Sequence, residues 1–188
     1  MLIGILLYVM VIHRAPTCSD GKQNGDERGV DCGGACRLVC AFDVTEPVVQ
    51  WSRAFPISTG VYNVVGYLEN RNETVGTKKL GYTFTLVDSA GATIWEKSGT
   101  TFLPPDSVYP VFEGRVMTGG RVPARTLLTL APVTEWEVFP YNREQFIVNS
   151  RALAGVDSTP RLDASITNTL IRDERDVEII ATIFNKEG

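Results

Sequence analysis

The stretch from Val61 to Phe102 constrains the fold most, because apolar residues recur in it at every second position. Two series show this alternation, with polar residues between most of their members: Tyr62, Val64, Gly66 and Leu68, and then Tyr82, Phe84 and Leu86. A period of two is the pattern of a half-buried β-strand. The stretch therefore predicts antiparallel strands that bury one face against a second sheet.

Further strands are expected before and after this stretch, and turn residues such as Gly91, Asp106 and Gly119 separate several of them. The expected strands cover residues 44–54, 61–70, 79–88, 92–102, 108–117, 126–131 and 145–152. An apolar content of 44% in 188 residues is enough for a packed core. The predicted fold class is an all-β sandwich. Trp51, Trp95 and Trp136 are interpreted as core or sheet-face aromatics, with a ligand platform as the alternative.

The first twelve residues, MLIGILLYVMVI, carry no charge. A helix of this length reaches about 18 Å, whereas a full membrane span takes about 20 apolar residues. We interpret residues 1–14 as a membrane anchor whose beginning lies outside the sequence. The alternative is a signal peptide, which is less favoured because no basic start and no small-residue cleavage site precede Ala15-Pro16.

All four cysteines, Cys18, Cys32, Cys36 and Cys40, lie in one stretch that is rich in Gly and Asp. So short a segment cannot bury a core of its own, and an even number of close cysteines beside a membrane segment predicts two disulfides. Their pairing is left open. Disulfides also predict that the chain from Cys18 onward lies outside the cytoplasm. A four-thiolate zinc site is the rival, and the wide spacing between Cys18 and Cys32 disfavours it.

Oxygen-bearing side chains crowd the same stretch, at Asp20, Asn24, Asp26, Glu27 and Asp31. Calcium is held by such ligands in Gly-punctuated loops, so a calcium site is one prediction, although the spacing is not that of a helix-loop-helix calcium site. The alternative needs no metal, because Asp and Asn side chains accept hydrogen bonds in tight turns and Gly supplies positive φ. No other cofactor is expected.

Two parts of the chain resemble known families. Residues 18–40 resemble a short Cys-Asp-Gly…Asp-Cys-Gly-Gly…Cys motif of secreted and surface-exposed bacterial proteins. Residues 44–150 resemble the FxLYD family of extracytoplasmic prokaryotic domains, and the positions that carry this likeness are Gly66, Asn70, Phe84, Leu86, Asp88 and Gly91. Val87 stands where the family motif has Tyr. The resemblance implies an immunoglobulin-like β-sandwich without established catalytic residues.

The strand pattern recurs near the end of the chain. Residues 162–168 repeat the form of residues 64–70 at an offset of 98 (168 − 70), and residues 182–188 repeat that of residues 85–91 at an offset of 97 (185 − 88). The repeat predicts a second sandwich that begins near Thr159 and is cut within it. Added strands of the first domain are the alternative. The expected domains are 1–14, the membrane anchor; 15–41, the disulfide-rich segment; 42–157, the first sandwich; and 158–188, the start of the second.

Several function classes find no support in the sequence. The only histidine, His13, lies beside the apolar segment, so triads based on Ser or Cys lack a base in the globular part. A net charge of −4 and a pI near 5.1 argue against nucleic-acid binding. We expect no catalysis. The predicted protein is membrane-attached through residues 1–12, mostly extracytoplasmic, and active in binding, adhesion or spacing toward a protein or glycan partner. The alternative is a non-catalytic accessory module of a larger secreted or envelope enzyme.

Overall fold

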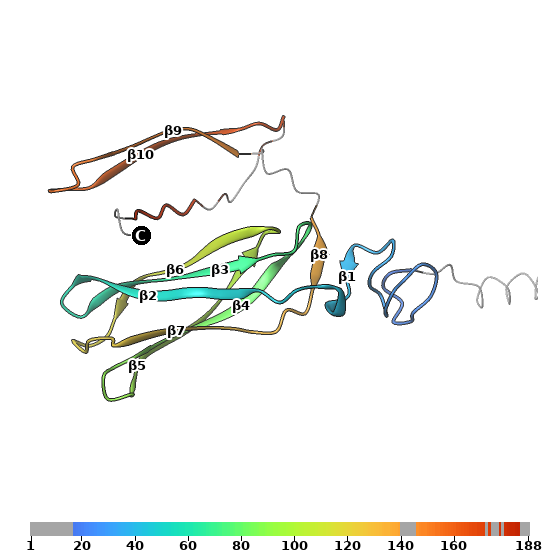
Figure 1. Ribbon diagram of the computed structural model, residues 1–188, viewed down its shortest axis with the longest axis horizontal. Coiled ribbons are helices and arrows are strands. Elements are labelled where there is room, and N and C mark those ends of the chain that lie inside the picture. Colours follow the sequence, from blue (N-terminus) through green and yellow to red (C-terminus); the bar gives the residue numbers. More distant parts are fainter. Residues whose placement is uncertain (1–16, 140–145, 172, 174–176, 178, 185–188) are drawn as a thin grey trace, which may run out of the picture. The chain divides into compact units, whose positions relative to one another are not determined.

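The computed structural model describes residues 17–139, 146–171, 173, 177 and 179–184 (Figure 1). The chain forms two compact units, Met1–Phe139 and Pro140–Gly188. All strand pairs in the described residues are antiparallel, so the all-β prediction is confirmed. The elements are β1 (Leu38–Val39), the 3-10 turn η1 (Ala41–Asp43), β2 (Val48–Ser58), β3 (Val61–Asn70), β4 (Val75–Val87), β5 (Thr93–Leu103), β6 (Ser107–Met117), β7 (Arg125–Leu130), β8 (Trp136–Val138), β9 (Phe146–Ala154) and β10 (Arg161–Asn168).

Two sheets make up the first unit. One has the order β2-β3-β6, and the other has the order β1-β8-β4-β5, with β7 also paired to β4. The long strand β4 serves two partners on one side, because Val75 lies opposite Val138 of β8 and Tyr82 lies opposite Leu130 of β7. Strand β4 is therefore the strand around which the larger sheet is built.

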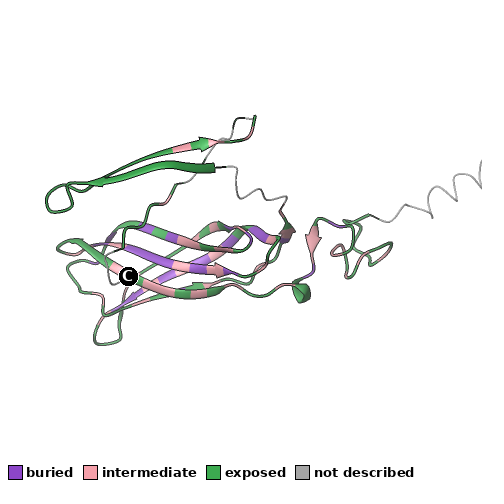
Figure 2. Cartoon of the chain, turned by 45° about the horizontal axis from the view of Figure 1, so that its top comes forward, coloured by how far each residue is buried: buried purple, intermediate pink, exposed green. Residues whose placement is uncertain are grey.

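Side chains of both sheets share one apolar core. It includes Val64 and Leu68 of β3, Phe84 and Leu86 of β4, and Leu128 of β7. The first four are fully buried, and burial of each such side chain stabilises the fold by about 1.5–3 kcal/mol. Figure 2 shows the buried residues along these strands of the first unit. The period-two series thus marks the inward faces of β3 and β4.

A polar cluster also crosses between the sheets. Glu113 of β6 is 8% exposed, and its carboxylate accepts a hydrogen bond from the Tyr82 hydroxyl at 2.9 Å. The Lys97 ammonium of β5 lies 2.6 Å from the other carboxylate oxygen. A buried carboxylate is tolerated only with such partners. Glu113 therefore ties its sheet to two strands of the opposite one.

The second unit contains the β9–β10 hairpin. Its strand β9 is exposed along its whole length, and the hairpin is drawn almost entirely in the exposed colour in Figure 2. Apolar side chains take part in this exposure: Phe146, Ile147, Val148, Leu153 and Leu162. The strand expected over residues 145–152 is β9, and it pairs with β10. The residues expected to begin a second sandwich thus contribute β10 to this hairpin.

The β9–β10 pairing repeats the β2–β3 pairing. In both hairpins the first strand carries a bulged residue at a matching position, Gln50 in one and Asn149 in the other, and β2 has a second register shift between Pro56 and Ser58. The facing pairs beside the bulge correspond: Val49–Leu68 with Val148–Ile166, Trp51–Tyr67 with Ser150–Ser165, and Ala54–Val64 with Leu153–Leu162. The offset is 99 positions in the first strand (148 − 49) and 98 in the second (166 − 68). The internal repeat of the sequence is therefore also a repeat of strand register.

The ends of the two second strands correspond as well. The Asn70 side-chain oxygen accepts a hydrogen bond from the backbone N–H of Asn72 at 3.1 Å, and that of Asn168 accepts one from Leu170 at 3.1 Å. An Asn that bonds the backbone two residues on turns the chain out of the strand. The repeated Asn thus ends the strand in the same way in both units.

Candidate functional site

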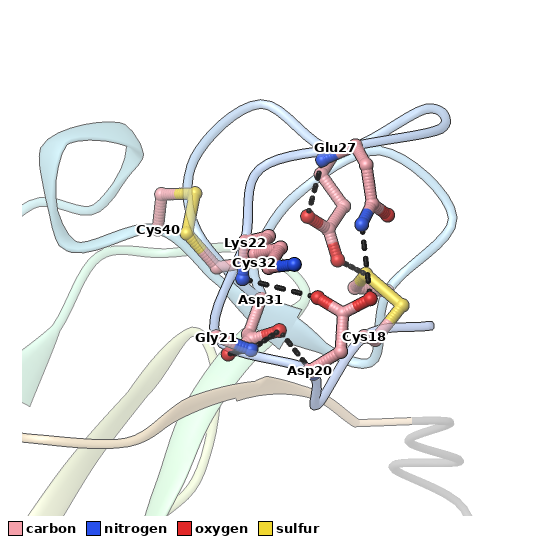
Figure 3. The surroundings of a disulfide bond; sticks show 10 residues. Cys18, Asp20, Gly21, Lys22, Glu27, Asp31, Cys32 and Cys40 are labelled. Carbon is pink, nitrogen blue, oxygen red and sulfur yellow. Dashed lines mark hydrogen bonds between the residues drawn. A yellow bond between two sulfur atoms is a disulfide. The ribbon is translucent and has the colours of Figure 1, made fainter. Parts of the chain in front are cut away.

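The candidate site is the disulfide-closed segment of residues 17–40, which we call the knot (Figure 3). Cys18 is bonded to Cys36, and Cys32 is bonded to Cys40, so no described cysteine is free. The predicted pair of disulfides is confirmed, and the pairing that the sequence left open is now assigned. With all four sulfurs paired, a four-thiolate zinc site does not form. Disulfides of this kind persist in oxidising compartments, which supports an extracytoplasmic location.

The acidic side chains of the knot organise its turns. The Asp31 carboxylate accepts hydrogen bonds from the backbone N–H of Asp20 at 2.8 Å and of Gly21 at 2.9 Å. The Asp20 carboxylate accepts one from Lys22 N–H at 3.0 Å and one from the Asn24 side-chain amide at 2.9 Å. The Asn24 amide, with smaller contributions from backbone N–H groups, lowers the pKa of Asp20 below its ordinary value. Figure 3 shows Asp20 and Asp31 on neighbouring turns.

Glu27 closes the next turn. Its carboxylate accepts a hydrogen bond from the backbone N–H of Asn24 at 3.1 Å. Glu27 is also the only carboxylate in the one three-ligand group found among the described residues, which it forms with Cys18 and Cys36. Both sulfurs of that group belong to the same disulfide, so they have no thiolate to offer a metal. This group is therefore a disulfide contact.

The acidic side chains predicted as calcium ligands, Asp20, Asp26, Glu27 and Asp31, form no three-ligand group with one another in the described residues. Asp20, Asn24, Glu27 and Asp31 direct side-chain oxygen or nitrogen atoms to hydrogen bonds within the knot, while Asp26 is exposed and its side chain forms no hydrogen bond or ion pair with the described residues. Carboxylates that already accept backbone N–H groups have fewer lone pairs left for a hard cation. The arrangement favours the turn interpretation of these residues.

Glycine is required at one point of the knot. Gly34 has φ of 61°, and a Cβ atom there would lie 1.7 Å from the carbonyl oxygen of Asp26. Any side chain at this position would push apart the turn at Asp26 and the turn at Gly34, which the disulfides hold together. The glycines of the sequence motif thus allow close packing of a segment that lacks an apolar core.

The knot is joined to the larger sheet by a short ladder. Leu38 of β1 lies opposite Glu137 of β8, and Val39 lies opposite Trp136. The Cys32–Cys40 disulfide follows directly after β1, and Trp136 is 2% exposed. Strand β8 in turn pairs with β4, where Val138 lies opposite Val75. Strand β1 of the knot is therefore a strand of the larger sheet.

Ion pairs reinforce this ladder. The Glu137 carboxylate is paired with Arg37 from the knot and, at 3.0 Å, with Lys78 from β4. The hydrogen bond from Lys78, with the smaller contribution of Arg37, lowers the pKa of Glu137 below its ordinary value. Asn72 adds a second clamp, since its side chain donates to the Thr45 carbonyl at 2.8 Å and accepts from the Thr45 N–H at 2.9 Å. The chain between the knot and β2 is thereby fixed at both ends.

The residues that carried the family resemblance have structural roles. Asn70 is buried and its amide donates to the carbonyls of Val75 and Pro104. Asp88 closes the β4–β5 turn by accepting hydrogen bonds from Ala90 and Ala92, and Gly91 supplies φ of 82° in the same turn. Asn70, Asp88 and Gly91 therefore shape strand ends and turns, and these roles in folding account for the motif.

Sequence reasoning missed the residues that attach the knot to the sheet. Arg37 and Glu137 are 100 positions apart, and β1 and β8 are two and three residues long. No local periodicity can reveal such short strands, and charges of opposite sign are common enough that a pair so far apart carries no signal. The one usable hint was the apolar pair at 38–39 just before Cys40.

Comparisons with known proteins add no assignment. No family model, no curated protein and no solved structure matches the chain. The residues 1–14 interpreted as a membrane anchor lie outside the described residues. Within the described part of the chain, no helix is long and apolar enough to span a membrane.

Proposed function

We propose that the chain is a membrane-attached, extracytoplasmic module without catalytic activity that serves in binding, adhesion or spacing. Its units would be immunoglobulin-like sandwiches of the FxLYD type, attached through residues 1–14 and displayed beyond the knot. The two disulfides support the compartment. The first unit has two antiparallel sheets that share one core, and this arrangement supports the assignment of a β-sandwich.

The observation that carries this proposal is the pairing of β1 with β8. A module that only needed a tether could be attached by a flexible linker. Here the segment nearest the proposed anchor is closed by two disulfides, extended into the sheet by a ladder and locked by Arg37 and Glu137. This construction fixes the orientation of the knot relative to the larger sheet, which suits a spacer or a presented binding surface.

The repeated register of β9–β10 supports a tandem arrangement. A spacer gains length by repeating one unit, and each unit then needs the same strand pairing and the same strand-ending Asn. Asn70 and Asn168 fill that position in the two hairpins. We propose that a second module of the first kind begins with β9 and β10, so that its first strand precedes residue 158, the start expected from the sequence.

Surface labelling in intact cells tests the proposal. The chain is expressed in a bacterium and treated with a membrane-impermeant amine reagent, which is expected to label the exposed Lys22 and Lys79 without cell lysis. Non-reducing peptide mapping is expected to recover Cys18 joined to Cys36. A variant without residues 1–14 should leave the membrane fraction. Labelling only after lysis, together with free thiols, would refute the proposed location and with it the function.

A further inference from the structure

The two disulfides of the knot differ in their access to solvent. Cys18 is exposed, its partner Cys36 is 8% exposed, and both line an open hollow of about 260 Å³. Cys40 is only 2% exposed, and it is bonded to the half-buried Cys32. A thiolate has to reach a sulfur before it can attack it, so the Cys18–Cys36 disulfide is the accessible one of the two.

Main-chain atoms cover the second disulfide. A Cβ atom on Gly29 would lie 2.8 Å from Cys32 Sγ and 3.0 Å from Cys40 Sγ, and one on Gly33 would lie 3.3 Å from Cys40 Sγ. The backbone of these two glycines therefore lies directly against both sulfurs. A reductant can reach the Cys32–Cys40 bond only after this packing has been disturbed.

The Glu27 carboxylate lies beside the accessible disulfide, with Oε1 3.6 Å from Cys36 Sγ. Figure 3 shows this side chain pointing toward the sulfurs. The backbone N–H of Asn24 donates a hydrogen bond to the other carboxylate oxygen at 3.1 Å and holds the side chain in place. A negative charge at this distance repels an incoming thiolate. Glu27 therefore slows attack on a disulfide that is otherwise open to solvent.

The Cys18–Cys36 bond determines how far the chain before the knot lies from β1. The Cα atoms of Cys18 and Cys36 are 5.6 Å apart. Once this bond is open, the first fixed point of the chain is Cys32, which stays bonded to Cys40. The fourteen steps from Cys18 to Cys32 reach about 46 Å when extended, at about 3.3 Å per residue. Exposed contacts, such as the bond from Gly21 N–H to Asp31, then hold this stretch without a covalent link.

We propose that the Cys18–Cys36 disulfide is a site of reversible thiol–disulfide exchange with an external dithiol, such as the paired cysteines of a redox protein. Its opening releases residues 18–31 and lengthens the connection between residues 1–14 and the first unit, while β1 stays in the larger sheet. The inference rests on the proposed function, because it gives a regulated length to the attachment proposed there.

The exchange takes place in two steps. A thiolate of the dithiol attacks the exposed Cys18 sulfur, the Cys18–Cys36 bond breaks, and its electron pair leaves on Cys36, which takes up a proton from water. The second thiolate of the dithiol then attacks the reductant's own sulfur in the mixed disulfide, and Cys18 leaves and is protonated. The dithiol is oxidised to a disulfide, and the protein disulfide is reduced to two thiols.

Graded reduction followed by alkylation tests the order of opening. The full chain is treated with rising concentrations of dithiothreitol, and the free thiols are alkylated and located by peptide mass spectrometry. Cys18 and Cys36 are expected to be alkylated at least about tenfold faster than Cys32 and Cys40. Equal rates, or earlier alkylation of Cys32 and Cys40, would overturn the proposal.

The variant E27Q tests the charge beside the disulfide. It keeps an acceptor for the Asn24 N–H and is expected to speed the reduction of Cys18–Cys36 by dithiothreitol about 2- to 10-fold. Reduction by a neutral phosphine is expected to change less than about twofold, because no anion approaches. The matched control E96Q removes a charge on β5 and is expected to change neither rate. Equal acceleration with both reductants would overturn the role assigned to Glu27.

Hydrogen exchange on C18S/C36S tests what the opening releases. The amide of Gly21 is expected to lose protection, whereas the amides of Gly33 and Val138, which bond to carbonyls at the two ends of β1, are expected to keep theirs. C32S/C40S is the matched control and is expected to lose protection at Gly33. Loss of protection at Val138 in a C18S/C36S variant with the thermal unfolding midpoint of the parent chain would show that opening detaches β1, and would overturn the proposal.

Failure of this inference is distinct from failure of the proposed function. A Cys18–Cys36 disulfide that resists dithiothreitol as strongly as Cys32–Cys40 would leave the surface-labelling result and the membrane-fraction result unchanged. Labelling only after lysis would refute the proposed location whatever the order of reduction.

Discussion

At the scale of single residues, Gly66 sets how closely the two sheets approach. A Cβ atom at this position would lie 2.3 Å from Leu128 Cδ2 and 3.2 Å from Phe84 Cε1. Atoms at the first distance overlap, so the buried Leu128 side chain or one of the two sheets has to shift. The apolar alternation of the sequence includes this glycine because the position faces inward, and only the structure shows that it has no room for a side chain.

We expect Gly66→Ala to lower the free energy of unfolding by about 1–3 kcal/mol, the usual cost of overpacking a core. The measurement is urea denaturation followed by tryptophan fluorescence. In the double variant G66A/L128A the overlapping methyl group of Leu128 is gone. The loss in free energy of unfolding of this double variant should therefore be smaller than the sum of the losses of the two single variants. Full additivity, or a G66A variant as stable as the parent chain, would contradict the steric explanation.

Glu113 is the residue on which the polar cluster between the sheets depends. Its removal leaves the buried Tyr82 hydroxyl without this acceptor and the Lys97 ammonium without its counter-ion. We expect Glu113→Ala to cost about 1–3 kcal/mol in urea denaturation, less than a fully buried pair, because the Lys97 side chain is 54% exposed and can turn to water.

Two further variants test the role of Glu113. E113Q keeps an acceptor for Tyr82 and is expected to lose less stability than E113A. E96A removes a carboxylate on the exposed side of β5 and is expected to stay within about 0.5 kcal/mol of the parent chain. An E113A variant that matches E96A in stability would show that the cluster contributes nothing to the joining of the sheets.

At the scale of elements, the sequence predicted strands with a regular alternation and missed those without one. The boundaries of β3 were predicted without error, because burial alternates from Val61 to Asn70 except at Val65. Strand β2 was expected over 44–54 and covers 48–58, since η1 and the Asn72 clamp on Thr45 hold the preceding residues out of the sheet. The pairing of two-residue β1 with β8 depends on tertiary contacts that no local pattern encodes.

The candidate site divides in the same way. Cysteine spacing was enough to predict two disulfides, but not which cysteines pair. The number of residues between two cysteines does not determine whether their side chains face each other in the folded chain. Residue type suggested calcium ligands at Asp20 and Asp31, and residue type cannot distinguish a ligand oxygen from one that accepts backbone N–H groups. The disulfide pairing and the role of these two carboxylates both depend on how the turns of the knot face each other.

Glu137 makes the β1–β8 ladder sensitive to acid. Its pKa is lowered in the folded protein, chiefly by Lys78, so the carboxylate stabilises the fold above its unfolded pKa, and this contribution is lost as the pH falls through the folded pKa. We expect E137Q to be less stable than the parent chain at neutral pH. The difference should shrink steadily below the ordinary pKa of a Glu side chain and vanish in strong acid.

Urea denaturation over a series of pH values, from about 7 down to about 2.5, measures this difference. E135Q is the control, because Glu135 is exposed and forms no ion pair with any residue that the structure describes, and it should show little effect at any pH. A difference between E137Q and the parent chain that stays constant through the acid range would show that the charge of Glu137 is not what stabilises the ladder.

At the scale of the whole molecule, the knot and the first unit are stabilised by different means. The core cluster of the sheets contains no cysteine, whereas the knot depends on disulfides that close loops of 18 and 8 residues. Loops of these sizes account for about 2–3 kcal/mol each in the chain-entropy description. Reduction should therefore remove the order of the knot before that of the sheets.

We expect a reductant to abolish hydrogen-exchange protection at the amide of Gly33, which bonds to the Leu38 carbonyl, and to leave β3 and β4 protected. The C32S/C40S variant should behave like the reduced protein in β1 but keep the first disulfide. Loss of protection in β3 and β4 at the same reductant concentration would mean that the sheets cannot fold without the knot.

The β1–β8 ladder also determines how the molecule carries force. A pull on the chain at Thr17 passes through the Cys18–Cys36 disulfide to β1 and is then spread over backbone hydrogen bonds and the charges of Arg37 and Glu137. Part of that traction enters the sheet sideways at β8 and β4, so β2 is not peeled away alone. A protein built in this way withstands tension applied at Thr17 better than its two-residue N-terminal strand suggests.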